Sequence, residues 1–126
     1  MSSHHDMAER YLAIWNEGDA ARRRARIAEL WASDARYADP LMAGEGHDGI
    51  EAMIAAAQAQ FGKQFPGHRF SLVGTPDGHG GNLRFSWSLA PEGGAPVAHG
   101  TDFATLDAEG KLTCVTGFLD QPSPGA

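Results

Sequence analysis

The spacing of the apolar residues changes once along the chain, at His68, and this change constrains the fold more than any other feature. Before it, as in the segment 50–61, apolar residues recur three or four positions apart, which is typical of amphipathic helices. After it, as in the segment 83–89, apolar and polar residues alternate, which is typical of half-buried strands. The order predicts an α+β fold, with three N-terminal helices packed on one face of a curved, mostly antiparallel sheet.

The predicted helices are bounded by capping residues. The first spans residues 6–16 and is capped by Asp6, and the second spans residues 20–32 and is capped by Asp19. The third begins at Asp48 and ends before Gly62. An extended segment at 35–39 and an irregular loop at 41–49 separate the second and third helices, and the arginines of the segment 22–26 are expected on a solvated helix face.

The strands are separated by turn sequences. The predicted strands begin at His68 and then span residues 83–89, 97–106 and 112–120, with turns at 75–82, 91–96 and 107–110. The expected organisation is therefore one domain over residues 6–120, between a disordered N-terminus at 1–5 and a disordered tail at 121–126.

Composition excludes several function classes. The chain has 126 residues and a net charge of −6, and an acidic domain is a poor binder of nucleic acid, which requires clustered Lys and Arg. We expect no membrane partner, because no apolar run approaches the roughly 20 residues of a membrane span. Cys114 is the single cysteine, and the N-terminus shows no signal-peptide pattern, so a cytoplasmic location is expected. The histidines lack metal-ligand spacing, and we expect no metal and no cofactor.

Local motifs along nearly the whole chain resemble one superfamily. They include the segments 11–19 (YLAIWNEGD), 37–40 (YADP), 100–103 (GTDF), 107–111 (DAEGK) and 117–120 (GFLD). Together they are similar to the nuclear transport factor 2-like superfamily, also called the cystatin-like α+β barrel. Within it, the chain looks most like the SnoaL-like polyketide cyclases and the ketosteroid isomerases. The resemblance implies a cone-shaped barrel with an internal pocket for an apolar small molecule.

Three residues match the catalytic positions of the ketosteroid isomerases in type and spacing. Tyr11 precedes the helix end Asn-Glu-Gly-Asp by five residues, Asp39 precedes a proline after the second helix, and Asp102 lies eight residues before Gly110. The resemblance implies Asp39 as general base, with Tyr11 and a protonated Asp102 as hydrogen-bond donors to an oxyanion; the Tyr and protonated Asp pairing is the established example of that family. The second helix is longer here, by about one turn, than in the isomerase pattern.

Other interpretations of these three residues stay open. Asp39 could serve only as an Asp-Pro turn residue, and Asp102 could be exposed or paired with Arg84 on the neighbouring strand. Tyr11 lies on the apolar stripe of its helix, where a tyrosine is more often a core residue with a satisfied hydroxyl. By strand alternation Asp102 faces the same side as Gly100 and Ala104, and counting back through the turn places it near Val115, with Gly117 close by.

A second group of residues is predicted to form the pocket. The expected wall residues are Trp15, His47, Phe85, Trp87, Val115, Gly117 and Leu119. SnoaL-like cyclases pair a histidine with an aspartate, which makes His47 a candidate at the pocket mouth. His99 is expected to point away from Asp102, because the two positions differ by an odd number of residues on one strand.

Three functions remain open at this level. The leading hypothesis is a small enzyme that moves a proton on an apolar carbonyl compound, of the isomerase, cyclase or dehydratase type. A non-catalytic ligand-binding or association domain of the same fold is the second, because fold does not fix function. An epoxide hydrolase of the limonene type is the third, although that family has an arginine two residues before the aspartate, where this chain has Gly100. A homodimer is expected, because residues 101–106 carry apolar or small side chains on both faces of the strand.

Overall fold

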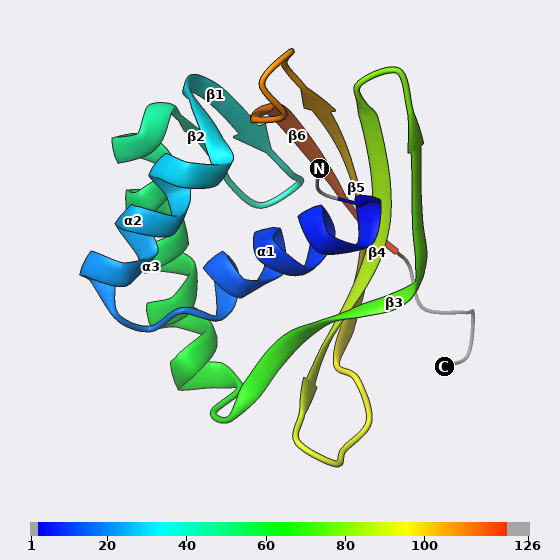
Figure 1. Ribbon diagram of the computed structural model, residues 1–126. Helices are drawn as coiled ribbons and strands as arrows, with labels where there is room; N and C mark the ends of the chain where they lie inside the picture. The colour runs from blue at the N-terminus through cyan, green and yellow to red at the C-terminus, as the bar shows by residue number, and fades with distance from the viewer. Residues whose placement is uncertain (1–2, 121–126) are drawn as a thin grey trace.

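The computed structural model describes residues 3–120, in which three helices pack against a curved six-stranded sheet (Figure 1). The helices are α1 (His4–Asn16), α2 (Ala20–Leu30) and α3 (Gly46–Gln64). The strands are β1 (Trp31–Ala38), β2 (Ala43–Glu45), β3 (His68–His79), β4 (Asn82–Pro91), β5 (Ala98–Leu106) and β6 (Leu112–Leu119). The predicted α+β class is confirmed. Residues 1–2 and the predicted tail at 121–126 lie outside the described residues.

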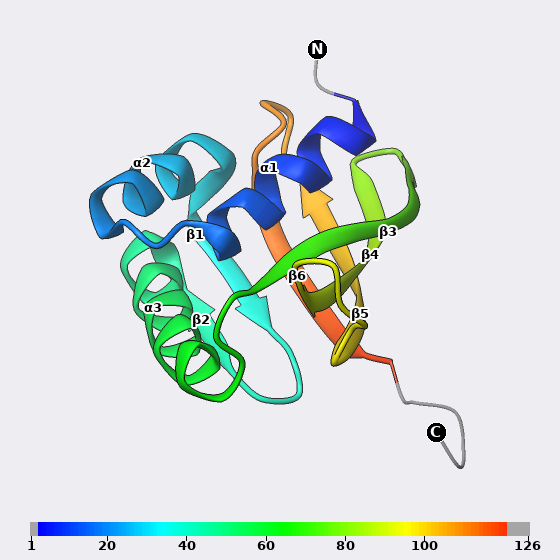
Figure 2. The ribbon, with the colours of Figure 1, turned by 90° about the horizontal axis from the view of Figure 1, so that it is seen from below.

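The strands run in the order β2-β1-β6-β5-β4-β3 and do not close into a complete barrel. Strand β1 pairs with β6 in parallel, and every other neighbouring pair in this sheet is antiparallel. Figure 2 shows α1 lying across the sheet, with α2 and α3 stacked beside it over β1 and β2. The C-terminal strands therefore supply the floor under α1, which is the arrangement expected for an internal site.

The helix caps explain one difference from the predicted boundaries and confirm another boundary. Helix α1 begins at His4, two residues earlier than expected, because Ser3 accepts a hydrogen bond from the Asp6 N–H at 3.0 Å and is the actual cap. Asp19 caps α2 as predicted, through the Arg22 N–H at 2.8 Å. The loop expected at 41–49 is more regular than its glycines suggested: it contains β2 and the first turn of α3.

Strand β3 is longer than the sequence indicated. The turn predicted at 75–82 is limited to Gly80 and Gly81, whose φ angles of 54° and 83° fit the left-handed region that glycine tolerates. Strand β3 continues through this segment with a register shift between Val73 and Asp77, beside Gly74 at a φ of 73°. The shift is a β-bulge, which accommodates turn-forming residues within a strand.

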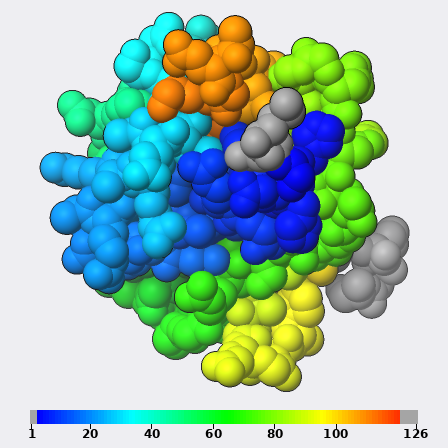
Figure 3. Space-filling view, viewed as in Figure 1, coloured from blue at the N-terminus to red at the C-terminus, as the bar shows by residue number. Residues whose placement is uncertain are grey.

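The core lies between α1 and the inner face of the sheet. The largest fully buried side chains include Tyr11, Ile27, Trp31, Ile54 and Leu83. Burying an apolar side chain of this size contributes about 1.5–3 kcal/mol to folding. Figure 3 shows α1 and α2 covering one side of the molecule, with the hairpin loop between β4 and β5, in yellow, projecting below.

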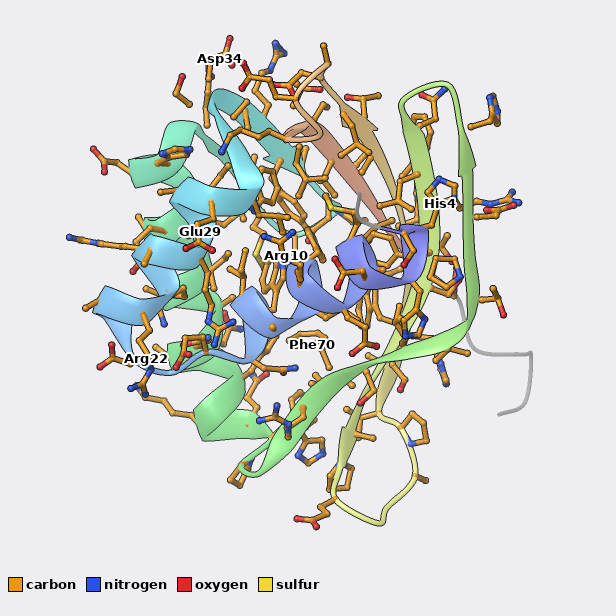
Figure 4. All side chains as sticks on the ribbon, in the orientation of Figure 1. His4, Arg10, Arg22, Glu29, Asp34 and Phe70 are labelled. Carbon is orange, nitrogen blue, oxygen red and sulfur yellow. The ribbon has the colours of Figure 1, made fainter. Side chains whose placement is uncertain are left out.

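The prediction that the arginines at 22–26 all face solvent is wrong at Arg23. Its guanidinium is buried and forms a two-point ion pair with Glu51 of α3, at 2.6 Å and 2.7 Å. The remaining donor reaches the Glu17 carbonyl and the Gln58 side chain, each at 2.8 Å. In contrast, Arg22 extends outward in Figure 4, with its side chain 70% exposed. Arg23 points inward because it joins α2 to α3 where the helices pack.

Candidate active site

A cavity of about 50 Å³ lies between α1, the inner face of the sheet and the loop that joins β1 to β2. Tyr11, Asp39 and Asp102, which come from three distant parts of the sequence, all line it. The other lining residues are Leu12, Trp15, Tyr37, Leu41, Met42, Phe61, Phe70, Trp87 and Leu119. In Figure 4, Phe70 lies between β3 and α1, on the inner side of the molecule.

Asp102 is a buried carboxyl group on the floor of this cavity. It lies on β5, 2% exposed, and faces inward together with Gly100 and Ala104, as strand alternation predicted. The Trp87 indole N–H donates to its Oδ1 at 3.2 Å. Burial raises the pKa of Asp102 to about 6; the Trp87 hydrogen bond and the nearby Tyr11 hydroxyl oppose this rise, and the charges of Asp39 and Asp120 add to it.

The alternative interpretations of Asp102 are wrong, and its predicted partner needs a correction. Asp102 is not exposed, and Arg84 pairs with Asp77 at 2.8 Å instead. Asp102 lies opposite Gly117 rather than Val115, because the β5–β6 pairing begins at Leu106 and Leu112, which leaves Lys111 in the turn, and shifts by one more residue between Thr105 and Leu106. Counting residues through a turn places a partner correctly only when both strands are regular up to the turn.

Tyr11 places a hydroxyl in the cavity without a partner. Its side chain is 2% exposed, and its oxygen has no hydrogen bond to any residue in the described range 3–120. The rings of Phe85 and Trp31 surround it, at centroid distances of 5.1 Å and 5.9 Å. Burial and the nearby charge of Asp102 raise the pKa of Tyr11 well above its usual value, so it stays protonated. The expected core tyrosine with a satisfied hydroxyl is therefore not what the structure contains.

Asp39 both orders a turn and lines the cavity. Its Oδ1 accepts the backbone N–H groups of Leu41 and Met42 at 2.7 Å and 2.9 Å, which is the turn role. Its Oδ2 accepts the hydroxyl of Tyr37 at 2.5 Å. The carboxylate is thus held in one orientation, with one unused lone pair, which is on Oδ2.

Sequence reasoning missed Tyr37 as a member of the site. Tyr37 is 6% exposed, lines the cavity and donates to Asp39. Burial, followed by the charge of Asp102 and the hydrogen bond to Asp39, raises its pKa. The available signal was position: Tyr37 precedes Asp39 by two residues, so strand alternation points both side chains to the same face.

Gly117 lies where the polar side chains of the site converge. A methyl group built at this position would lie 3.1 Å from each of Asp102 Oδ1, Asp39 Cβ and the Tyr37 hydroxyl oxygen. Such contacts are tighter than ordinary van der Waals packing, so the absence of a side chain here allows the three groups to approach one another.

Gly117 is not among the residues that line the cavity, although it lies beside three that are, and the other predicted wall residues divide into three groups. Trp15, Trp87 and Leu119 line the cavity as expected. Phe85 and Val115 are buried behind it, in the core. His47 is not brought to the cavity: it lies in the first turn of α3, with its Nε2 2.8 Å from the Trp31 carbonyl oxygen.

Two further wall residues, Phe61 and Phe70, were seen in the sequence only as apolar positions of a helix and a strand. Their meeting depends on how α3 packs against β3, which one-dimensional spacing does not reveal. His99 is exposed, as predicted.

The cavity lining carries two carboxyl groups and two phenols but no arginine, lysine or histidine. Water activation of the limonene type uses an arginine beside its aspartates, and here Gly100 occupies the corresponding position under the Trp87 indole. Over residues 3–120 there is no group of three His, Cys, Asp or Glu side chains arranged to hold a metal ion. The same residues contain no helix of the length and apolarity needed to span a membrane.

The model of the SnoaL-like domain family matches residues 8–115 of the chain. The protein belongs to the SnoaL-like family. A solved structure from Agrobacterium tumefaciens, described as a candidate isomerase of this family, is 51% identical, covers 95% of this chain and 100% of its own, and superposes with a TM-score of 0.85. The superfamily predicted from the local motifs is therefore confirmed for this SnoaL-like protein.

More distant structures share the fold alone. A candidate polyketide cyclase from Sinorhizobium meliloti is 16% identical over 89% of this chain and 93% of its own, with a TM-score of 0.63. A protein from Silicibacter pomeroyi with a cystatin-like fold is 19% identical over 95% of this chain and 77% of its own, with a TM-score of 0.65. No curated protein matches the chain.

Proposed function

We propose that this SnoaL-like protein is a cofactor-independent enzyme that moves a proton on an apolar carbonyl compound, as an isomerase or cyclase does. The observation that carries the proposal is the unpartnered hydroxyl of Tyr11 beside the buried carboxyl of Asp102, in a cavity that Asp39 also lines. A buried donor without a partner costs about 1–3 kcal/mol, and a ligand oxygen would remove that cost. The description of the 51% identical relative as a candidate isomerase supports the same reaction class.

In the proposed reaction, Asp39 is the general base. A free lone pair on Oδ2 takes the proton from the carbon next to the carbonyl, the C–H bond breaks, and its electron pair moves to the carbonyl oxygen. Tyr11 and Asp102 donate hydrogen bonds to that oxygen, which strengthen as its negative charge develops. Return of the proton from Asp39 to a different carbon completes an isomerisation without any other reactant.

The role of Asp102 depends on its protonation state. A carboxyl group donates a hydrogen bond only when it is neutral, and a pKa of about 6 leaves roughly one-tenth of the free protein in that form at pH 7. An oxyanion in the cavity would repel the ionised form and favour the neutral one. We therefore expect turnover at low substrate concentration to decline as the pH rises above about 6.

The cavity limits the proposed substrate. Its walls are largely aromatic and aliphatic, but its volume of about 50 Å³ is far below the roughly 300–1,000 Å³ of ordinary ligand pockets. We infer that only the reacting end of the substrate occupies this cavity. The remainder extends past Leu41, which is 66% exposed on the loop at the cavity mouth.

Proton exchange tests the reaction class without knowledge of the substrate. Small cyclic ketones, including β,γ-unsaturated ones, are incubated with the protein in D₂O, and deuterium incorporation at the α-carbon is followed by NMR. We expect exchange above the buffer rate for wild type, loss of that exchange in Asp39→Asn, and no change in Asp34→Asn, which alters an exposed aspartate. Binding of these ketones without exchange in wild type would contradict the proposal and favour a ligand-binding domain.

We also propose that the protein forms a homodimer through the outer face of the sheet. Phe103 and Phe118 lie on adjacent strands of this face and are 43% and 55% exposed. Large apolar side chains this exposed favour burial against a partner. Light scattering at micromolar concentration should give the mass of two chains, reduced to one by Phe118→Asp; a monomeric wild type would contradict this proposal.

A further inference from the structure

Asp102 accepts its hydrogen bond from a side chain that can only donate. The indole of Trp87 has one N–H and no acceptor, and it lies 3.2 Å from Asp102 Oδ1. Whatever the protonation state of Asp102, Oδ1 must therefore act as an acceptor in this contact. A neutral carboxyl group accepts more strongly through its carbonyl oxygen than through its hydroxyl oxygen, so this contact favours the proton on Oδ2.

Trp87 is itself held in place from two sides. Trp87 of β4 lies directly opposite Gly100 of β5, and a methyl group at Gly100 would overlap Cζ2 and Cε2 of the indole and lie 2.8 Å from its Nε1. The ring of Phe70 packs edge-on against the other side, at a centroid distance of 5.2 Å. The indole lies flat over Gly100 because that position carries no side chain.

We propose that Trp87 is a positioning residue that holds Asp102 Oδ1, so that Oδ2 is the oxygen that donates to a ligand in the cavity. Gly100 has no side chain and thereby leaves the space that the indole requires. This inference rests on the proposed role of Asp102 as a hydrogen-bond donor. It adds a function to a residue that sequence analysis placed only in the pocket wall.

The effect of Trp87 on the pKa of Asp102 can be distinguished from the effects of the other groups around this carboxyl. Tyr11 approaches from α1, Tyr37 and Asp39 from β1 and the loop after it, and Asp120 from the end of β6. The carboxylates of Asp39 and Asp120 destabilise the ionised form of Asp102, whereas the Trp87 N–H and, to a smaller extent, the Tyr11 hydroxyl stabilise it. Removal of the N–H should therefore raise the pKa of Asp102, in the direction opposite to the effect of letting water into the cavity.

The experiment is an NMR titration of the Asp102 carboxyl carbon in ligand-free protein with ¹³C-labelled aspartate, assigned with Asp102→Asn. We expect a wild-type midpoint near pH 6. Trp87→Phe should raise it by about one pH unit, the size expected for one hydrogen bond to a charged group. Trp15→Phe is the matched control: Trp15 lines the same cavity, and its indole N–H has no partner among residues 3–120. It should move the midpoint by less than about 0.3 units on the same scale.

A second pair of variants tests the role of Gly100 and covers the case in which Trp87→Phe does not fold. Gly100→Ala keeps the indole but displaces it, so it should shift the midpoint upward as Trp87→Phe does. Gly62→Ala is its control, because a methyl group there meets no atom within 4 Å. Equal shifts in Trp87→Phe and Trp15→Phe, or no upward shift in either Trp87→Phe or Gly100→Ala, would overturn the inference.

The titration is independent of the reaction. If wild type exchanges no α-proton but Trp87→Phe raises the midpoint, the positioning of Asp102 stands and the proposed function fails. If wild type exchanges α-protons and Trp87→Phe leaves the midpoint unchanged, the proposed function stands and the role of Trp87 fails.

Discussion

The protein buries two polar clusters that differ in how completely their groups are paired. The paired cluster, formed by Arg23, Glu51 and Gln58, joins the helices: the guanidinium makes four hydrogen bonds, and the Gln58 amide reaches the Trp15 and Glu17 carbonyls. The open cluster, formed by Tyr11 and Asp102, lies under α1; it contains a hydroxyl without a hydrogen-bond partner among residues 3–120 and a carboxyl group that accepts from the Trp87 indole N–H.

The difference in pairing indicates that one cluster contributes to stability and the other to function. Buried polar groups in folded proteins are nearly always hydrogen-bonded, and the paired cluster follows this rule completely. The open cluster departs from it next to a cavity, where a ligand can supply the missing acceptor. We therefore expect changes in the paired cluster to act on folding and changes in the open cluster to act on binding and catalysis.

The largest expected effect is on the paired cluster. Arg23→Ala leaves the Glu51 carboxylate buried without its partner, and such a change costs about 3–5 kcal/mol of unfolding free energy. Urea unfolding measures the loss. Arg22→Ala is the control, since this exposed arginine contributes at most about 1 kcal/mol. Similar losses in both variants would mean that the burial of Arg23 does not determine its contribution.

The open cluster should make stability depend on pH in a defined direction. The pKa of Asp102 is about 6 in the folded protein, against about 3.9 in an unfolded chain, so the folded state binds the proton more tightly. Its contribution to stability is then full below about pH 4 and is lost as the pH rises through about 6. Relative to Asp102→Asn, wild type should lose about 2 kcal/mol of unfolding free energy between pH 4 and pH 7.5. Parallel pH profiles of the two proteins would contradict the raised pKa.

The features that depend on periodicity and local motifs could be predicted from the sequence. The change in apolar spacing at His68 predicted helices packed on a sheet. The motifs around Tyr11, Asp39 and Asp102 predicted three residues that line one cavity. Spacing alone could not reveal Arg23, because one buried position in a run of four arginines is decided by the packing of α2 on α3.

Contacts between neighbouring strands could not be predicted from the sequence either. The opposition of Asp102 and Gly117 depends on a bulge, and the hydrogen bond from Trp87 depends on the rotamer that Gly100 permits. Tyr37, in contrast, was predictable from strand alternation, because it precedes Asp39 by two residues, whereas the three-residue isomerase motif includes only Tyr11 as its tyrosine.

A smaller effect is expected where the open cluster meets Asp39 and Tyr37. In Gly117→Ala the added methyl group must displace one of these side chains or Asp102, at a cost of about 1–3 kcal/mol in unfolding free energy. The same displacement should reduce α-proton exchange. Gly62→Ala, at an open position of α3, should leave the exchange rate unchanged and raise the unfolding free energy by up to about 1 kcal/mol, because alanine favours the helix more than glycine does. A fully stable and active Gly117→Ala would show that the three groups need not approach so closely.

The most direct test of the account compares folding and activity in one variant, Tyr11→Phe. Because the hydroxyl has no partner in the described protein, its removal should change the unfolding free energy by less than about 0.5 kcal/mol or increase it. Loss of one donor to the oxyanion should lower the rate of α-proton exchange by about 10²–10³. If the variant instead loses 1–2 kcal/mol of stability while its exchange rate is unchanged, Tyr11 is a structural residue and the central claim is wrong.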